Sequence, residues 1–330
     1  MNNFETLTAK IGDKINNGLW RLRKVKKIRN YFGMPILDAQ SGNDLIADLL
    51  KMPLPVMISR FGSVELGCIS NFIQIRRFRQ ARGIKRFKGI AGRGDKDFWK
   101  DNVKTGMASL AGFFPITDDM LERFCLEFIE HIKSIDVLGV WFNYYEDHVF
   151  YRYCPNSKLV PLRSIEPYYH NNPWSRLLQG EKVLLVHPYE ESIRKQYEKR
   201  RLLFKDKDIL PDFSLDTVKA VQNPNIDDTQ TEFRDWFRAY ESMCHKISKK
   251  DFDIAIIGAG AYGLPLASFV KKMGKKAVHM GGATQIMFGI KGRRWDTRRF
   301  FSDMYNEHWV RPSGSETPKN YMMAENGCYW

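Results

Sequence analysis

The chain has 330 residues, of which 43% are hydrophobic, and its 52 Lys and Arg residues outnumber its 38 Asp and Glu residues. A chain of this length and composition can bury a large core, so we expect a folded protein and not a disordered one. The excess of positive charge favours an anionic partner: a nucleotide, a phospholipid surface or nucleic acid.

The five cysteines are scattered, with no CxxC pair and no His at metal-ligand spacing. This pattern argues against a zinc module and predicts reduced thiols. The N-terminal sequence lacks the pattern of a signal peptide, and no apolar run reaches the roughly 20 residues needed to span a bilayer. We therefore expect a cytoplasmic protein.

Residues 15–31 predict a basic amphipathic helix within an N-terminal extension that covers residues 1–50. Apolar side chains recur at helical spacing on one side, and most of the Lys and Arg residues lie elsewhere on the helix. The helix either packs on the protein or lies on the inner face of the cell membrane, where burial and anionic lipid would both stabilise it. The apolar stripe is Ile15, Leu19, Leu22, Val25 and Ile28.

A basic, aromatic stretch over residues 76–100 follows the first predicted strand, residues 56–59. Basic residues interleaved with aromatic ones are also found in nucleic-acid-binding surfaces. No nucleic-acid-binding module accompanies the stretch, so we expect a helix and loop that cover the strand, and no nucleic-acid partner.

Further apolar runs predict strands that alternate with helices along the rest of the chain. This alternation predicts an α/β fold: a Rossmann-like, mostly parallel sheet with helices on both faces. We expect one domain over residues 51–310, with weakly marked sub-lobes at 51–175 and 181–310, and a C-terminal tail over 311–330. The later strands are expected at residues 137–142, 159–162, 183–186, 254–257 and 277–280, and the helices at 192–204, 231–249 and 264–273.

The strongest local motif is a GxGxxG sequence formed by Gly258, Gly260 and Gly263, with Tyr262 inside it. It follows a predicted strand and opens a predicted helix, the context in which backbone N–H groups and a helix N-terminus approach phosphate. The motif therefore predicts a nucleotide site. The alternative is a tight turn that binds no ligand.

The sequence after this motif argues against NAD. A dinucleotide-binding fold normally supplies Asp or Glu about 20 residues further on to hold the ribose hydroxyls. Here the next strand ends in His279, Met280, Gly281 and Gly282, and too few residues follow for a second half of a dehydrogenase sheet. An oxidoreductase is therefore the second choice.

Polar residues also follow two other predicted strands. Arg60 and Glu65 follow the first strand, and His187 and Glu190 follow the fourth. Ligands of open α/β sheets bind at the carboxyl ends of the strands, so we expect these groups to converge on one crevice. Each also has a structural alternative: Glu65 as a helix cap, His187 as a buried imidazole, and Glu190 as an acid favoured by a helix dipole.

Residues 58–65, 256–267 and 275–282 together resemble the type-D-fold bacterial glycosyltransferases, and residues 279–295 are similar to proteins of surface-polysaccharide clusters. In that family an Arg-x-Gly-Asp-x-Glu segment serves a metal-bound nucleoside diphosphate sugar. Ser63 replaces the first acid here, so Glu65 is left as the single carboxylate for Mn²⁺ or Mg²⁺, which prefer several oxygen ligands.

The resemblance implies a glycosyltransferase that moves a sugar from a nucleoside diphosphate sugar, such as a UDP-sugar, to a glycan or lipid-linked acceptor. Glu65, His187 and Glu190 are the catalytic candidates, and Glu65 is also the metal candidate. The alternatives are an NAD(P)- or flavin-dependent oxidoreductase and a non-catalytic nucleotide-binding protein of a polysaccharide assembly. The expected nucleotide-sugar contacts are Arg60, Gly62, Ser63, Gly258, Gly260, Tyr262, Gly263, His279, Gly281, Gly282, Lys291 and Arg293, with Arg294 as a further candidate.

Overall fold

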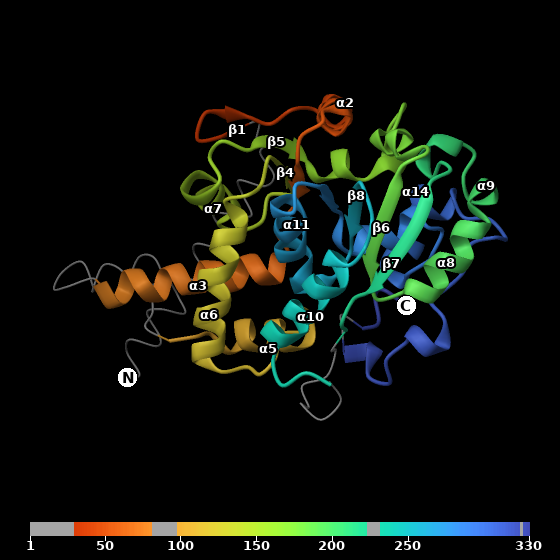
Figure 1. Ribbon diagram of the computed structural model, residues 1–330. Helices are drawn as coiled ribbons and strands as arrows, with labels where there is room; N and C mark the ends of the chain where they lie inside the picture. The colour runs from red at the N-terminus through yellow and green to blue at the C-terminus, as the bar shows by residue number, and fades with distance from the viewer. Residues whose placement is uncertain (1–29, 81–97, 223–231, 324–325) are drawn as a thin grey trace.

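The computed structural model describes residues 30–80, 98–222, 232–323 and 326–330. These residues form a seven-stranded, all-parallel sheet with helices packed on both faces (Figure 1). The Rossmann-like α/β fold expected from the alternation of strands and helices is confirmed. In sheet order the strands are β5 (Lys158–Pro161), β4 (Val137–Val140), β3 (Met57–Ser59), β9 (Lys276–His279), β8 (Ile254–Ile257), β6 (Lys182–His187) and β7 (Ser214–Lys219).

The inner strands are the apolar runs of the sequence. β4 and β8 are buried at every position, as expected for strands covered on both faces of a parallel sheet. β7 was not predicted from the sequence, because this edge strand mixes apolar residues with Asp216 and Lys219 and is only partly buried. An edge strand lacks the continuous apolar pattern on which the prediction depended.

Helices cover the two faces of the sheet, and each set packs into its own apolar core. The helices of the first core are α3 (Ser63–Gln80), α5 (Asp101–Ser109), α6 (Asp118–Ile132), α7 (Glu146–Tyr153), α10 (Trp236–Ser248) and α11 (Gly263–Lys272). Those of the second core are α2 (Ala39–Lys51), α8 (Glu190–Glu198), α9 (Arg200–Leu203), α12 (Thr284–Met287), α13 (Arg293–Asp296) and α14 (Arg299–Ser302).

Shorter elements connect these layers. β1 (Asn30–Tyr31) and β2 (Met34–Pro35) form a small antiparallel hairpin outside the main sheet. The 3₁₀ segments are η2 (Leu162–Ile165), η3 (Pro167–Tyr169), η4 (Trp174–Leu178), η5 (Lys207–Ile209), η7 (Gly260–Tyr262), η8 (Gly281–Ala283), η9 (Gly314–Glu316) and η10 (Tyr321–Met323).

The chain leaves neighbouring strands toward opposite faces of the sheet. It passes from β3 into α3 and from β8 into α11, both in the first core, whereas it passes from β9 into α12 and from β6 into α8, both in the second. Where adjacent strand ends diverge in this way, a crevice opens at the carboxyl edge of the sheet. The topology thus places a crevice between the loops that follow β3, β9, β8 and β6.

The two suggested sub-lobes contribute to one sheet, because β3 pairs with β9 through Met57 with Ala277 and Ile58 with Val278. The described residues of the segment 311–330 fold back onto the domain, where Glu316 accepts the backbone N–H groups of Glu191 and Ser192 at the start of α8. They are therefore part of the packed structure.

Most of the predicted helix 15–31 lies outside the described residues, as do residues 81–97 of the basic, aromatic stretch. The last two residues of that predicted helix form strand β1 instead. In the same extension, α2 buries Ile46, Ala47 and Leu50 in the second core. None of the described helices is long and apolar enough to cross a membrane.

Candidate functional site

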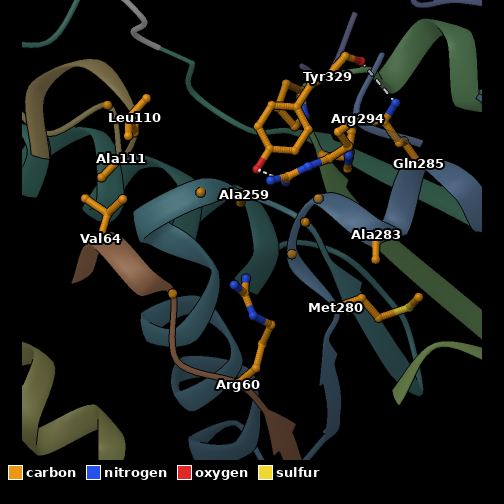
Figure 2. Close-up of a pocket in the computed structure, with 18 of the residues that line it drawn as sticks. Arg60, Val64, Leu110, Ala111, Ala259, Met280, Ala283, Gln285, Arg294 and Tyr329 are labelled. Carbon is orange, nitrogen blue, oxygen red and sulfur yellow. Dashed lines mark hydrogen bonds between the residues drawn. The ribbon is translucent and has the colours of Figure 1, made fainter. Parts of the chain in front are cut away.

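A cavity of about 340 Å³ lies at the carboxyl edge of the sheet, where the topology opens the crevice. Loops from strands far apart in the sequence form its walls (Figure 2). The sequence-predicted residues that line it are Arg60, Gly62, Ser63, Glu65, His187, Gly258, Gly260, Tyr262, Gly281, Gly282 and Arg294. Five other candidates, Glu190, Gly263, His279, Lys291 and Arg293, make contacts elsewhere.

The glycine turn after β8 packs closely on its neighbours. A Cβ on Gly258 would lie 2.6 Å from the carbonyl oxygen of Gly281 and 2.7 Å from Cδ2 of His187. Gly260 has φ of +51°, and a Cβ there would meet only the carbonyl oxygen of Ala111, at 3.6 Å. Gly258 thus allows the strand ends to approach each other, whereas Gly260 presents backbone to the cavity.

Arg60 follows β3 and points into the cavity from one side (Figure 2). Its guanidinium lies 4.6 Å from the centroid of the Trp141 ring and directly against the backbone of Gly281. Its Nε is buried, and no described group hydrogen-bonds to it. The charged guanidinium of Arg60 lines the cavity, and this suits an anionic ligand there.

Arg294 and Tyr329 lie on the opposite side of the cavity (Figure 2). Nη1 of Arg294 donates to the Tyr329 hydroxyl at 2.8 Å, and the guanidinium lies 4.8 Å from the centroid of that ring. The exposed Arg298 also lines the cavity. Cationic groups therefore face the cavity from two sides.

The other two cations predicted near the phosphates lie elsewhere. Nζ of Lys291 lies 5.2 Å from the centroid of the Tyr305 ring. Arg293 lines a second cavity, of about 330 Å³, and donates to the carbonyl oxygen of Asn326 at 3.4 Å. Successive residues of a helix point about 100° apart, so Arg293 and Arg294 at the start of α13 line different cavities.

Glu65 lines the cavity but is only 8% exposed. Burial raises the pKa of its carboxyl, and a hydrogen bond from its own backbone N–H and the charge of Arg60 lower it. The carboxylate folds back over Gly62 at the start of α3, where an added Cβ would overlap it. An acid in the first turn that reaches back in this way caps its helix.

The residues to which the resemblance assigns the Mn²⁺ or Mg²⁺ ion, Ser63 and Glu65, do not fit it. Glu65 lies against its own helix N-terminus and near the positive charge of Arg60, and Ser63 supplies no second carboxylate. Within the described ranges, no group of three or more His, Cys, Asp or Glu side chains could hold a metal ion. All five cysteines, each of which is described, are buried, and none forms a disulfide bond.

His187 lines the cavity as a neutral imidazole. Burial lowers its pKa to about 3, and its Nδ1 accepts the backbone N–H of Tyr189 at 3.0 Å. With Nδ1 occupied as an acceptor, Nε2 carries the proton. His187 is therefore suited to donate a hydrogen bond and unsuited to the role of base.

Two further candidates make structural contacts. Nδ1 of His279 lies 3.0 Å from Oγ of Ser59, its Nε2 faces Gly263, and burial and the charge of Arg60 lower its pKa to about 3. Glu190 accepts a hydrogen bond from the hydroxyl of Thr217 on β7 and another, of 3.1 Å, from Arg194. Neither His279 nor Glu190 lines the cavity.

A second carboxylate of the cavity, Glu166, was not predicted from the sequence. It lines the cavity between η2 and η3 and accepts a hydrogen bond of 3.0 Å from the hydroxyl of Tyr168. Burial raises its pKa to about 6, and that hydrogen bond and nearby arginines, Arg60 among them, lower it. The signal was available, because Glu166 follows the predicted strand 159–162 at the same edge of the sheet.

Five aromatic residues of the cavity were also missed, one of which is Trp295 on α13. Trp141 follows β4 and Tyr189 follows β6, so both obey the strand-end rule. Tyr329 and Trp330 come from the C-terminal segment and carried no such signal. The cavity thus combines arginines, carboxylates, aromatic rings and glycine backbone.

No protein-family model, no curated protein and no solved structure matches this chain.

Proposed function

We propose that this protein is a glycosyltransferase that moves a sugar from a nucleoside diphosphate sugar, most simply a UDP-sugar, to a hydroxyl of a growing bacterial surface glycan. The observation that carries the proposal is Arg60: its positively charged guanidinium lines the cavity and lies directly against the glycine backbone of Gly281. The oxygens of a diphosphate would pair with the part of this guanidinium that lines the cavity.

Sugar transfer breaks the bond between the anomeric carbon and the diphosphate, which leaves with the bonding electrons. Groups fixed in advance around the departing oxygens lower the barrier to this step. We assign this role to Arg60 and to the backbone N–H groups of residues 259–261, because those of Gly258, Tyr262 and Gly263 already bond backbone carbonyls. Arg294 lies on the opposite side of the cavity from Arg60 (Figure 2). The arginines supply the positive charge, and no step is assigned to a metal ion.

The acceptor hydroxyl must lose a proton as its oxygen bonds to the anomeric carbon, and we assign Glu166 as the base. With a pKa of about 6, its carboxyl is mostly ionised at neutral pH and still takes up a proton readily. His187 donates from Nε2 to an oxygen of the donor substrate. Glu65 keeps its place as a helix cap beside Arg60.

A thermal-shift screen of UDP, GDP, CMP, NAD and FAD, with and without Mn²⁺, tests the ligand class. Only ligands that prefer the native state raise its stability, so we expect a rise with a nucleoside diphosphate, independent of Mn²⁺. Release of the diphosphate from the matching nucleotide sugar on addition of an acceptor tests the reaction.

The alternatives give different results in the same experiments. Stabilisation by NAD or FAD without a response to UDP, GDP or CMP would replace the proposal with an oxidoreductase. Stabilisation by a nucleoside diphosphate without turnover of any nucleotide sugar would favour a non-catalytic binding protein. Either result contradicts the proposed transfer.

A further inference from the structure

Glu146, the first residue of α7, is a fully buried carboxylate outside the wall of the cavity. Its Oε2 accepts three successive backbone N–H groups, those of Trp141 at 3.2 Å, Phe142 at 2.7 Å and Asn143 at 3.2 Å. Phe142 has φ of +61°, which curls the loop around the carboxylate oxygen. Glu146 therefore fixes the loop between β4 and α7.

Trp141 connects this loop to the cavity. Its indole Nε1 donates to the carbonyl oxygen of Phe61 at 3.0 Å, and its ring lies 4.6 Å from the guanidinium carbon of Arg60. The backbone of Trp141 is thus held by Glu146, and its ring is held by the residue that follows Arg60. The ring forms one of the surfaces on which the guanidinium rests.

We propose that Glu146 is a positioning residue that sets the anion affinity of the cavity by holding Trp141 against the guanidinium of Arg60. The inference rests on the part of the proposed function in which Arg60 binds an anionic group of the ligand. An arginine already oriented on an aromatic face loses less freedom when it binds an anion. Without Glu146 the loop relaxes and Arg60 is no longer held in place. Binding of the anion must then also order Arg60, and this lowers the affinity.

Inorganic pyrophosphate, titrated calorimetrically into folded protein, is the probe. Glu146→Ala and Trp141→Leu should each weaken its binding about tenfold, and the double variant should be no weaker than either single one. Glu146→Gln keeps an oxygen for the three N–H groups and should restore most of the affinity. If Glu146→Ala does not fold, the pyrophosphate affinities of Trp141→Leu and Glu146→Gln test the proposal.

Tyr31→Phe is the matched control. The Tyr31 hydroxyl donates to the same Oε2 at 2.8 Å but holds no part of the loop. This variant should lose stability and keep the pyrophosphate affinity of the wild type. A loss of affinity in Tyr31→Phe as large as that in Glu146→Ala would show that general destabilisation explains the effect.

With a nucleotide sugar, Glu146→Ala should raise KM about tenfold and leave kcat within about twofold, because it weakens binding of substrate and transition state alike. The inference is overturned if folded Glu146→Ala binds pyrophosphate like the wild type, if the Glu146 and Trp141 effects add, or if the wild type binds no pyrophosphate. Coupled pyrophosphate binding without any sugar transfer would instead overturn the proposed function and leave the inference standing.

Discussion

The guanidinium of Arg60 lies directly against the backbone of Gly281: a Cβ added to Gly281 would lie 2.5 Å from Nη1 of Arg60. The two residues follow the neighbouring strands β3 and β9, from which the chain turns to opposite faces of the sheet. The close approach therefore depends on both the topology and the missing side chain.

Gly281→Ala should displace Arg60 and weaken nucleoside diphosphate binding by about tenfold or more, measured by calorimetric titration. Its φ of +65° also adds backbone strain, so some stability will be lost. Gly274→Ala is the matched control, because Gly274 has φ of +81° but no atom within 4 Å of an added Cβ. If both variants lose stability and neither loses affinity, Gly281 does not support Arg60.

Glu166→Gln should lower kcat by roughly 10²- to 10⁴-fold, the usual contribution of a general base, and should leave nucleoside diphosphate affinity within about threefold. In the wild type, kcat should fall below pH about 6, as Glu166 takes up a proton, and this acid limb should be absent from the residual rate of the variant. A steady-state pH profile measures both effects.

Glu190→Gln is the comparison for Glu166, because both are acids that follow strands of the sheet. The contacts of Glu190 with Thr217 and Arg194 predict that kcat stays within about twofold of the wild type. A large loss of kcat in Glu190→Gln with unchanged activity in Glu166→Gln would reverse the assignment.

The buried carboxyl of Glu146 should make the stability of the protein depend on pH. Burial raises its pKa from 4.5 to about 7, so between these values the native state holds a proton that the unfolded chain has released. The contribution of this proton to the free energy of unfolding is fully present below pH 4.5 and is lost as the pH rises through about 7. Glu146→Gln should therefore gain unfolding free energy relative to the wild type across this window, on the order of 3 kcal/mol by pH 8.

Denaturant unfolding at several pH values measures that difference. The comparison with the variant is needed because His187 and His279, whose pKa values burial lowers, contribute the opposite slope below pH 6.5. A constant difference between wild type and variant from pH 4.5 to pH 8 would contradict the raised pKa of Glu146.

Residues 15–31 predict binding to anionic membranes. Their basic residues should attract anionic lipid with up to about 1 kcal/mol each, so liposome binding should rise with anionic lipid content and weaken with salt. Deletion of residues 1–29 should release the protein and preserve nucleotide binding, since the cavity is built from later residues. Loss of folding on deletion, or no binding to anionic liposomes at low salt, would contradict a membrane role.

The sequence allowed the fold and the place of the site to be predicted, because both follow from simple patterns. Continuous apolar runs such as those of β4 and β8 are typical of a doubly covered parallel sheet. In such a sheet the strand ends share one edge, so Arg60, His187 and the glycine turn were expected to meet.

The direction of individual side chains could not be predicted in the same way. Glu190 lies three residues after His187, yet its carboxylate accepts a hydrogen bond from Thr217 on β7. The strand β7 was itself not predicted, because polar residues interrupt its apolar pattern. Tyr329 and Trp330 reach the cavity only through the folding back of the C-terminal segment. Such contacts depend on tertiary packing, which local patterns do not encode.

The central claim is that this cavity binds a nucleoside diphosphate through Arg60. Calorimetric titration of UDP and GDP into the wild type and Arg60→Ala tests it most directly. We expect saturable one-to-one binding of one of the two nucleotides to the wild type, and binding weaker by about a hundredfold in a folded Arg60→Ala variant. Equal affinity in the two proteins, or no binding of either nucleotide to the wild type, would contradict the account.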